Sequence, residues 1–130
     1  MSFRRVKNNT LSGSIRLAAP PEKVWDLITT VASITDWYDT WDAVEHAADD
    51  ERLQVGTSFR LIRHRIGRAH TAVCRVIALQ APTRLRWVQY APHQPTVMVE
   101  FWLLADTEGS TSTWLNHTKS WVEPSDHRYH

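Results

Sequence analysis

The hydrophobic positions between residues 19 and 41 follow a helical period. Four aliphatic residues recur at i, i+3, i+4 and i+7, which places them on one helix face: Val24, Leu27, Ile28 and Val31. Pro20 and Pro21 precede them, and proline suits a first helical turn because its φ is already helical and the turn has spare N–H groups. The pattern predicts a short amphipathic helix, a break, and a second helical turn that carries Trp37 and Trp41.

A period of two replaces the helical period in the rest of the chain. It predicts a strand over residues 11–18, before the helices, and further strands over 43–48, 55–65, 71–79, 84–90, 96–105 and 111–121. Short turn signals separate them, such as Asp49-Asp50-Glu51 and Ala81-Pro82-Thr83. A small helical unit followed by consecutive strands must pack on the sheet that they form, so the fold class is α+β with a curled meander.

Composition places this chain among single-domain globular proteins. Its 130 residues suffice for one core, with residues 1–10 as an N-terminal extension and residues 122–130 as a short tail. The single cysteine, Cys74, argues against a disulfide framework and fits a reducing compartment. No secretory signal and no apolar run of the roughly 20 residues needed for a transmembrane helix are seen, so we expect a cytoplasmic protein.

Charge is unevenly distributed although the net charge is only +1. Acidic residues cluster between positions 36 and 51, whereas arginines dominate positions 52 to 86. The two zones either solvate the surface and face each other, or the second forms a cationic sheet face or cavity rim for an anionic ligand. A pI near 8 and the lack of a recognisable nucleic-acid-binding motif make nucleic acid an unlikely partner class.

Several short motifs occur in an order that resembles a known superfamily. They are Pro-Pro-Glu-Lys followed by Val-Trp-Asp-Leu-Ile, then Asp-Trp-Tyr, Val-Gly-Thr-Ser-Phe, and Val-Ile-Ala-Leu-Gln-Ala-Pro-Thr-Arg-Leu-Arg-Trp. Over residues 11–121 the chain resembles the START-like (SRPBCC) helix-grip superfamily, with the polyketide cyclase/dehydrase-like and lipid-transport branches most similar. The resemblance implies a curved antiparallel sheet of about seven strands, gripping a long C-terminal helix around an apolar cavity.

The sequence departs from that pattern at its end. Only nine residues follow Trp121, so the gripping helix is expected to be absent or truncated. An open apolar sheet face of several hundred Å² would cost on the order of 10 kcal/mol. We therefore expect a homodimer, a domain swap, another partner or a removed tail to cover it. The strand predicted over residues 96–105, apolar on both faces, fits self-association.

Tryptophans are the first candidates for a ligand site, because six of the seven lie on segments that would rim or floor the cavity. They either fill the core or form a flat aromatic pocket for a hydrophobic, aromatic or polycyclic molecule. The candidate ligand-binding residues are Trp37, Trp41, Phe59, Cys74, Trp87, Gln89 and Trp102. Cys74 is itself interpreted as a small core residue.

Three polar residues are candidates for catalysis. Arg63 shares parity with Phe59 and would either orient an anionic or carbonyl oxygen or lie exposed on the sheet. Glu100 lies either among large apolar groups, where it would serve as an acid or base, or in solvent. His117, on the last strand, is the histidine best placed for a pocket, although a core or surface role is the alternative. No metal-ligand spacing and no cofactor motif are recognised.

Three functions remain open from the sequence. The first is a carrier or binder of a hydrophobic small molecule. The second is a polyketide cyclase or aromatase-type enzyme in which arginine, glutamate or histidine polarises carbonyls and moves protons. The third is a dimeric interaction module without a small-molecule ligand.

Overall fold

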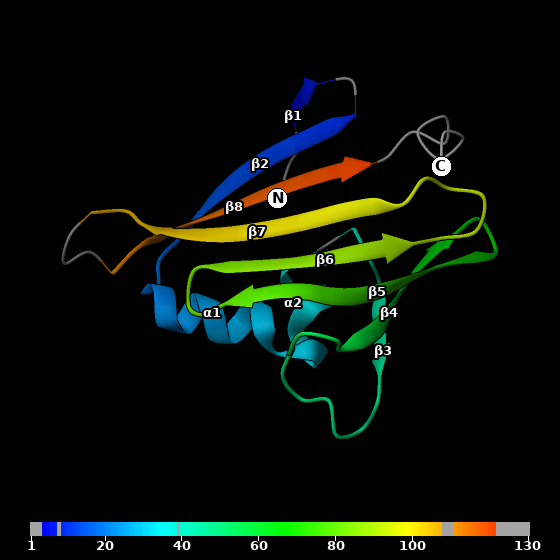
Figure 1. Cartoon of the computed structure of the whole chain (residues 1–130), viewed down its shortest axis with the longest axis horizontal. Coiled ribbons are helices and arrows are strands. Elements are labelled where there is room, and N and C mark those ends of the chain that lie inside the picture. Colours follow the sequence, from blue (N-terminus) through cyan, green and yellow to red (C-terminus); the bar gives the residue numbers. More distant parts are fainter. Residues whose placement is uncertain (1–3, 8, 39, 108–110, 122–130) are drawn as a thin grey trace.

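The computed structural model describes residues 4–7, 9–38, 40–107 and 111–121. All strands in this part of the chain join one antiparallel sheet in the order β1-β2-β8-β7-β6-β5-β4-β3 (Figure 1). The strands are β1 (Arg4–Lys7), β2 (Thr10–Leu17), β3 (Ala43–His46), β4 (Ser58–Arg65), β5 (Arg68–Gln80), β6 (Arg84–Tyr90), β7 (Val97–Ala105) and β8 (Thr113–Trp121). The helical segments α1 (Pro21–Thr29), η1 (Val31–Ser33) and α2 (Ile34–Trp37) follow β2.

The predicted α+β class, the curved antiparallel sheet and the helices after the first predicted strand are confirmed. The sheet has eight strands, one more than expected, because residues 4–7 pair with β2 as an edge strand. These residues were expected to belong to an N-terminal extension. Edge pairing uses backbone groups and needs no apolar alternation, so the side-chain pattern did not indicate β1.

Helix α1 begins where proline predicts it, and its buried face matches the predicted one at Val24 and Ile28 but differs at Leu27. Val24, Trp25 and Ile28 are buried, whereas Leu27 is 36% exposed. The helix contacts β7 and β8, so the residues that face those strands decide the buried stripe. Trp25 has a larger apolar surface than Leu27 and is only 7% exposed, so its burial supplies more stabilisation.

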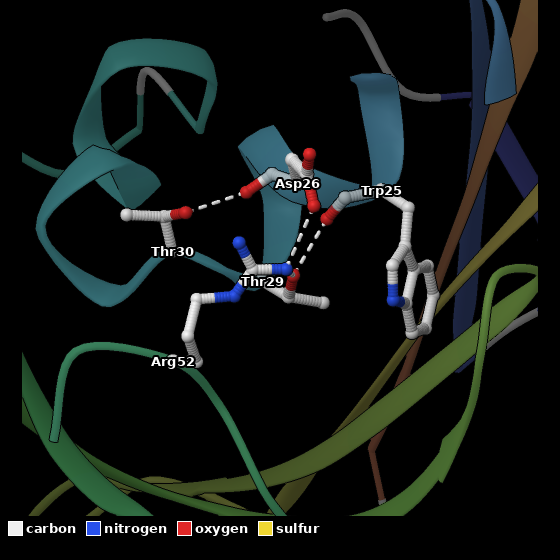
Figure 2. Close-up of polar contacts among 5 residues, drawn as sticks. All are labelled: Trp25, Asp26, Thr29, Thr30 and Arg52. Carbon is white, nitrogen blue, oxygen red and sulfur yellow. Dashed lines mark hydrogen bonds and ion pairs between the residues drawn. The ribbon is translucent and has the colours of Figure 1, made fainter. Parts of the chain in front are cut away.

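Polar side chains close the C-terminal end of α1 and attach it to the segment after β3 (Figure 2). The hydroxyls of Thr29 and Thr30 donate to the backbone carbonyls of Trp25 and Asp26, at 2.7 and 2.6 Å. Arg52 Nη2 donates to Asp26 Oδ1 and to Thr29 Oγ1, both at 2.9 Å. The hydroxyl contacts are i−4 bonds of the kind that threonine forms to the preceding helical turn, and the Arg52 contacts fix the helix against the loop.

The core lies between the helices and the inward-facing positions of the strands. Alternate residues of β4 to β8 supply it: Phe59, Leu61, Cys74, Val76, Leu85, Trp87, Val99, Phe101, Leu103, Leu115 and His117, each no more than 4% exposed. Trp87 packs edge-on against Phe59 with ring centroids 5.1 Å apart. We call the part of this inward face that the helices cover the core half.

The helices cover only part of the inward face. In Figure 1 they lie beneath the left and central parts of the sheet, while β6 and β8 run on toward the right. Within the described residues no helix follows β8; the predicted tail, residues 122–130, lies outside them. None of the described helices is long and apolar enough to span a membrane.

Candidate functional site

A partly open pocket of about 730 Å³ lies at the end of the inward face. Its walls come from β2, β4, β5, β6, β7 and β8, from the loop between β6 and β7, and from the segment between α2 and β3. The lining residues are Leu11, Trp41, Arg63, Ala69, His70, Thr71, Ala72, Gln89, Ala91, Pro92, Gln94, Pro95, Val97, Lys119 and Trp121. We call this part of the inward face the pocket half. Its volume is in the range of small-molecule sites.

Two cations contribute to the pocket from different strands. Arg63 on β4 lies opposite His70 of β5, and Lys119 on β8 lies between Leu11 of β2 and Val99 of β7 in the strand register. Because the sheet is curved, β4 and β8 line the same hollow although three strands separate them. The Arg63 guanidinium carbon lies 5.3 Å from the centroid of the Trp41 ring, within cation–π range.

Neither cation has a carboxylate partner among the described residues. The ion pairs found there join Asp26, Glu100 or Asp106 to arginines elsewhere on the surface. The Nε of Arg63 is buried and meets no hydrogen-bond acceptor in the described part of the chain. Burial lowers the pKa of Lys119, and the nearby positive charge of Arg63 lowers it further.

Gln89 connects the pocket to the core. Its Oε1 accepts hydrogen bonds from Trp87 Nε1 at 3.3 Å and from the Cys74 thiol at 3.7 Å. With its oxygen held by these two donors, Gln89 has the two N–H groups of Nε2 to offer as it lines the pocket. Besides the cations, the pocket therefore contains an amide donor in a fixed orientation.

Of the predicted site residues, the pocket brings together Trp41, Arg63 and Gln89. Trp41 and Gln89 are only 7% and 5% exposed, so each forms part of the wall. Arg63 points inward, as its shared parity with Phe59 allowed. Whether these residues bind a ligand stays a prediction.

Four other predicted ligand-binding residues belong to the core half. Phe59, Cys74 and Trp87 are 2%, 0% and 0% exposed, and Trp37 packs edge-on against Phe101 with ring centroids 4.9 Å apart. They do not line the pocket. The sequence placed them on the inward face, but the position of the helices decided that this part of the face is filled by protein.

His117 is also a core residue. It is fully buried, stacked on Phe101 at 4.2 Å and edge-on to Tyr38 at 5.3 Å between ring centroids. Burial lowers the pKa of His117 to about 3, so the imidazole is neutral at physiological pH. It does not line the pocket.

Glu100 and Trp102 lie on the opposite, outer face of β7. Glu100 Oε2 accepts from Arg86 Nη2 at 2.6 Å and from Arg86 Nε at 3.0 Å. Trp102 is two residues after Glu100 on β7 and therefore lies on the same face, where it pairs with Arg84 and Asn116 in the strand register. The alternative in which Glu100 sits among buried apolar groups is therefore wrong, because the buried row of β7 is Val99, Phe101 and Leu103.

Sequence reasoning missed Lys119 as a site residue, and it placed Trp121 on a segment at the cavity without including it among the candidate ligand-binding residues. Both share the parity of His117 on β8, and that phase was the available signal. The structure shows that the helices do not reach this end of β8, so its inward-facing row continues from the core into the pocket.

The comparisons with known proteins identify the class first. The structure is similar to a START superfamily protein from Mycobacterium smegmatis, with 13% identity, TM-score 0.67, and coverage of 88% of this chain and 77% of that one. A protein from Rhodobacter sphaeroides gives 22% identity, TM-score 0.71, and coverage of 95% and 80%. At these identities the likeness shows the fold alone, and it is the expected START-like helix-grip fold.

The family follows from the sequence itself. Residues 18–130 match the family described as Activator of Hsp90 ATPase homolog 1-like protein, and the chain belongs to it. An Hsp90 activator from Plasmodium falciparum shares the fold, with 14% identity, TM-score 0.63, and coverage of 89% of this chain and 75% of that one. No curated protein was found to match this chain.

Proposed function

We propose that this protein binds a hydrophobic small molecule in the pocket half of its sheet. The observation that supports the proposal is the hollow of about 730 Å³, whose wall combines apolar residues such as Trp41, Val97 and Trp121 with polar ones such as Arg63, Gln89 and Lys119. Apolar surface with polar groups that fix orientation is typical of small-molecule sites. Burial of a ligand's apolar surface supplies the affinity at about 25 cal/mol per Å² before the costs of association.

The test begins with native mass spectrometry of the protein purified from cells, which reports the mass of any bound molecule. Affinity for that molecule, or for naphthalene-2-carboxamide, is then measured by calorimetry. Trp41→Ala should weaken binding at least about tenfold, because an aromatic wall is lost.

Trp102→Ala is the matched control, because it removes a tryptophan from the outer face. Ala91→Trp is a second variant that fills the pocket from its loop and should block binding. Equal affinities of the original protein, Trp41→Ala and Ala91→Trp would contradict the proposal.

The cyclase-type enzyme is the weaker alternative. It depends on polar groups that converge inside the cavity, and the three candidates, Arg63, Glu100 and His117, are divided between the pocket, the outer face and the core half. Proton transfer requires groups within hydrogen-bonding reach of one substrate. The interaction module, with a homodimer or other partner covering the sheet, stays a prediction that sedimentation velocity on a dilution series tests.

A further inference from the structure

The pocket half carries positive charge without negative charge among its described lining residues. Arg63 and Lys119 line the same hollow, and both are half-buried. A buried charge is costly unless it is paired. Two partly buried positive charges with no carboxylate among the described lining residues therefore destabilise the empty pocket, and a bound anion would offset this cost.

The geometry around these cations is that of an amphipathic site. Apolar side chains surround them, including Leu11, Val97 and Trp121, and Gln89 offers amide N–H groups from the same wall. Arg63 Nε is buried without an acceptor in the described chain, so the guanidinium is not fully satisfied by described protein groups. Guanidinium and ammonium donors form strong charge-assisted hydrogen bonds to a carboxylate.

We infer that the ligand is an anionic amphipath, a hydrophobic or aromatic carboxylate, whose oxygens bind Arg63 and Lys119 while its apolar body lies against Trp41 and Trp121. This inference rests on the proposed small-molecule function and adds the chemical class of the ligand. No covalent step is involved.

The test compares two probes of nearly equal shape, naphthalene-2-carboxylate and naphthalene-2-carboxamide, by calorimetry on the full chain at pH 7.5. The carboxylate should bind at least about tenfold more tightly than the amide, a preference of about 1.4 kcal/mol. Lys119→Met and Arg63→Met should each remove most of this preference and leave amide binding within about threefold. Added salt should reduce the preference, because ions screen partly exposed charges.

Arg75→Met is the matched control, because it removes one exposed arginine from the outer face of β5. Lys119→Arg keeps the charge and should retain the preference for the carboxylate. It therefore separates the effect of lost charge from the effect of a variant that folds poorly. Equal binding of both probes to the original protein, unchanged in Lys119→Met, would overturn the inference and leave the small-molecule function intact. Binding of neither probe, with no ligand mass in the native spectrum, would overturn both.

Discussion

The core half and the pocket half belong to the same strands and use the same side-chain parity, yet their chemistry differs. On β4 the inward row runs from Phe59 and Leu61 to Arg63, and on β8 it runs from Leu115 to Lys119. The change occurs where the helical segments stop covering the sheet. Because a strand repeats every two residues whatever lies above it, one strand can build both a dry core and a charged pocket wall.

The energetic consequences of the two halves are opposite. In the core half, aromatic and aliphatic side chains are almost fully excluded from water, and their burial stabilises the fold. In the pocket half, Arg63 and Lys119 are partly desolvated and have no carboxylate partner among the described residues, which costs stability. Binding sites are commonly retained at such a cost because function depends on groups that folding alone would not favour.

The largest contrast is expected from tryptophan truncation. Trp87→Ala should lower the free energy of unfolding by about 3–5 kcal/mol, because a fully buried ring would leave a cavity. Trp121→Ala, at the partly exposed end of β8, should cost about 1–2 kcal/mol. Urea denaturation measures both values, and equal losses would contradict the division into two halves.

The buried histidine makes the core half sensitive to acid. The pKa of His117 is about 3 in the folded protein and near 6.5 when unfolded, so the unfolded state binds more protons between these values. The free energy of unfolding should therefore fall as pH decreases below about 6.5, with a contribution of roughly 2–3 kcal/mol by pH 4.5. His117→Gln should flatten that part of the pH profile measured by denaturation, and an unchanged slope would assign it to other groups.

Removing charge from the pocket half should stabilise the protein slightly. Lys119→Met keeps an unbranched side chain, one atom shorter, and relieves desolvation and repulsion by Arg63. We expect the free energy of unfolding to rise by up to about 1 kcal/mol. Arg75→Met on the outer face should change it by less than about 0.5 kcal/mol. A clear loss of stability in Lys119→Met, measured by urea denaturation, would show that the ammonium group is paired.

The smallest effect concerns the hairpin between β4 and β5, outside both halves. Ile66 has φ +45° and is fully exposed, and Gly67 follows it with φ +72°. A β-branched residue is strained in the left-handed region, whereas Asn-Gly is the preferred pair for such a two-residue turn. Ile66→Asn should raise the free energy of unfolding by about 0.5–1 kcal/mol, which thermal denaturation would show as a slightly higher midpoint. A lower midpoint would mean that Ile66 makes a stabilising contact.

Much of the fold could be predicted from the sequence. The period-two segments lie within about three residues of the observed strand ends, and Pro20 and Pro21 mark the start of α1. These features depend on local backbone geometry and on the exclusion of water from one face, and both produce a regular spacing of apolar residues along the sequence. The sequence of β1 shows no alternation of apolar and polar residues, because an edge strand can pair through its backbone without burying a side-chain row.

The sequence by itself determined which side chains share a row: Trp87 with Gln89, and Glu100 with Trp102. Only the tertiary structure decided which row faces inward and how far the helices extend along it. It therefore decided that His117 is buried, that Glu100 pairs with Arg86 outside, and that Arg63 and Lys119 share a pocket. The physical reason is that parity is a property of one strand, whereas cover and sheet curvature arise from contacts between segments distant in the chain.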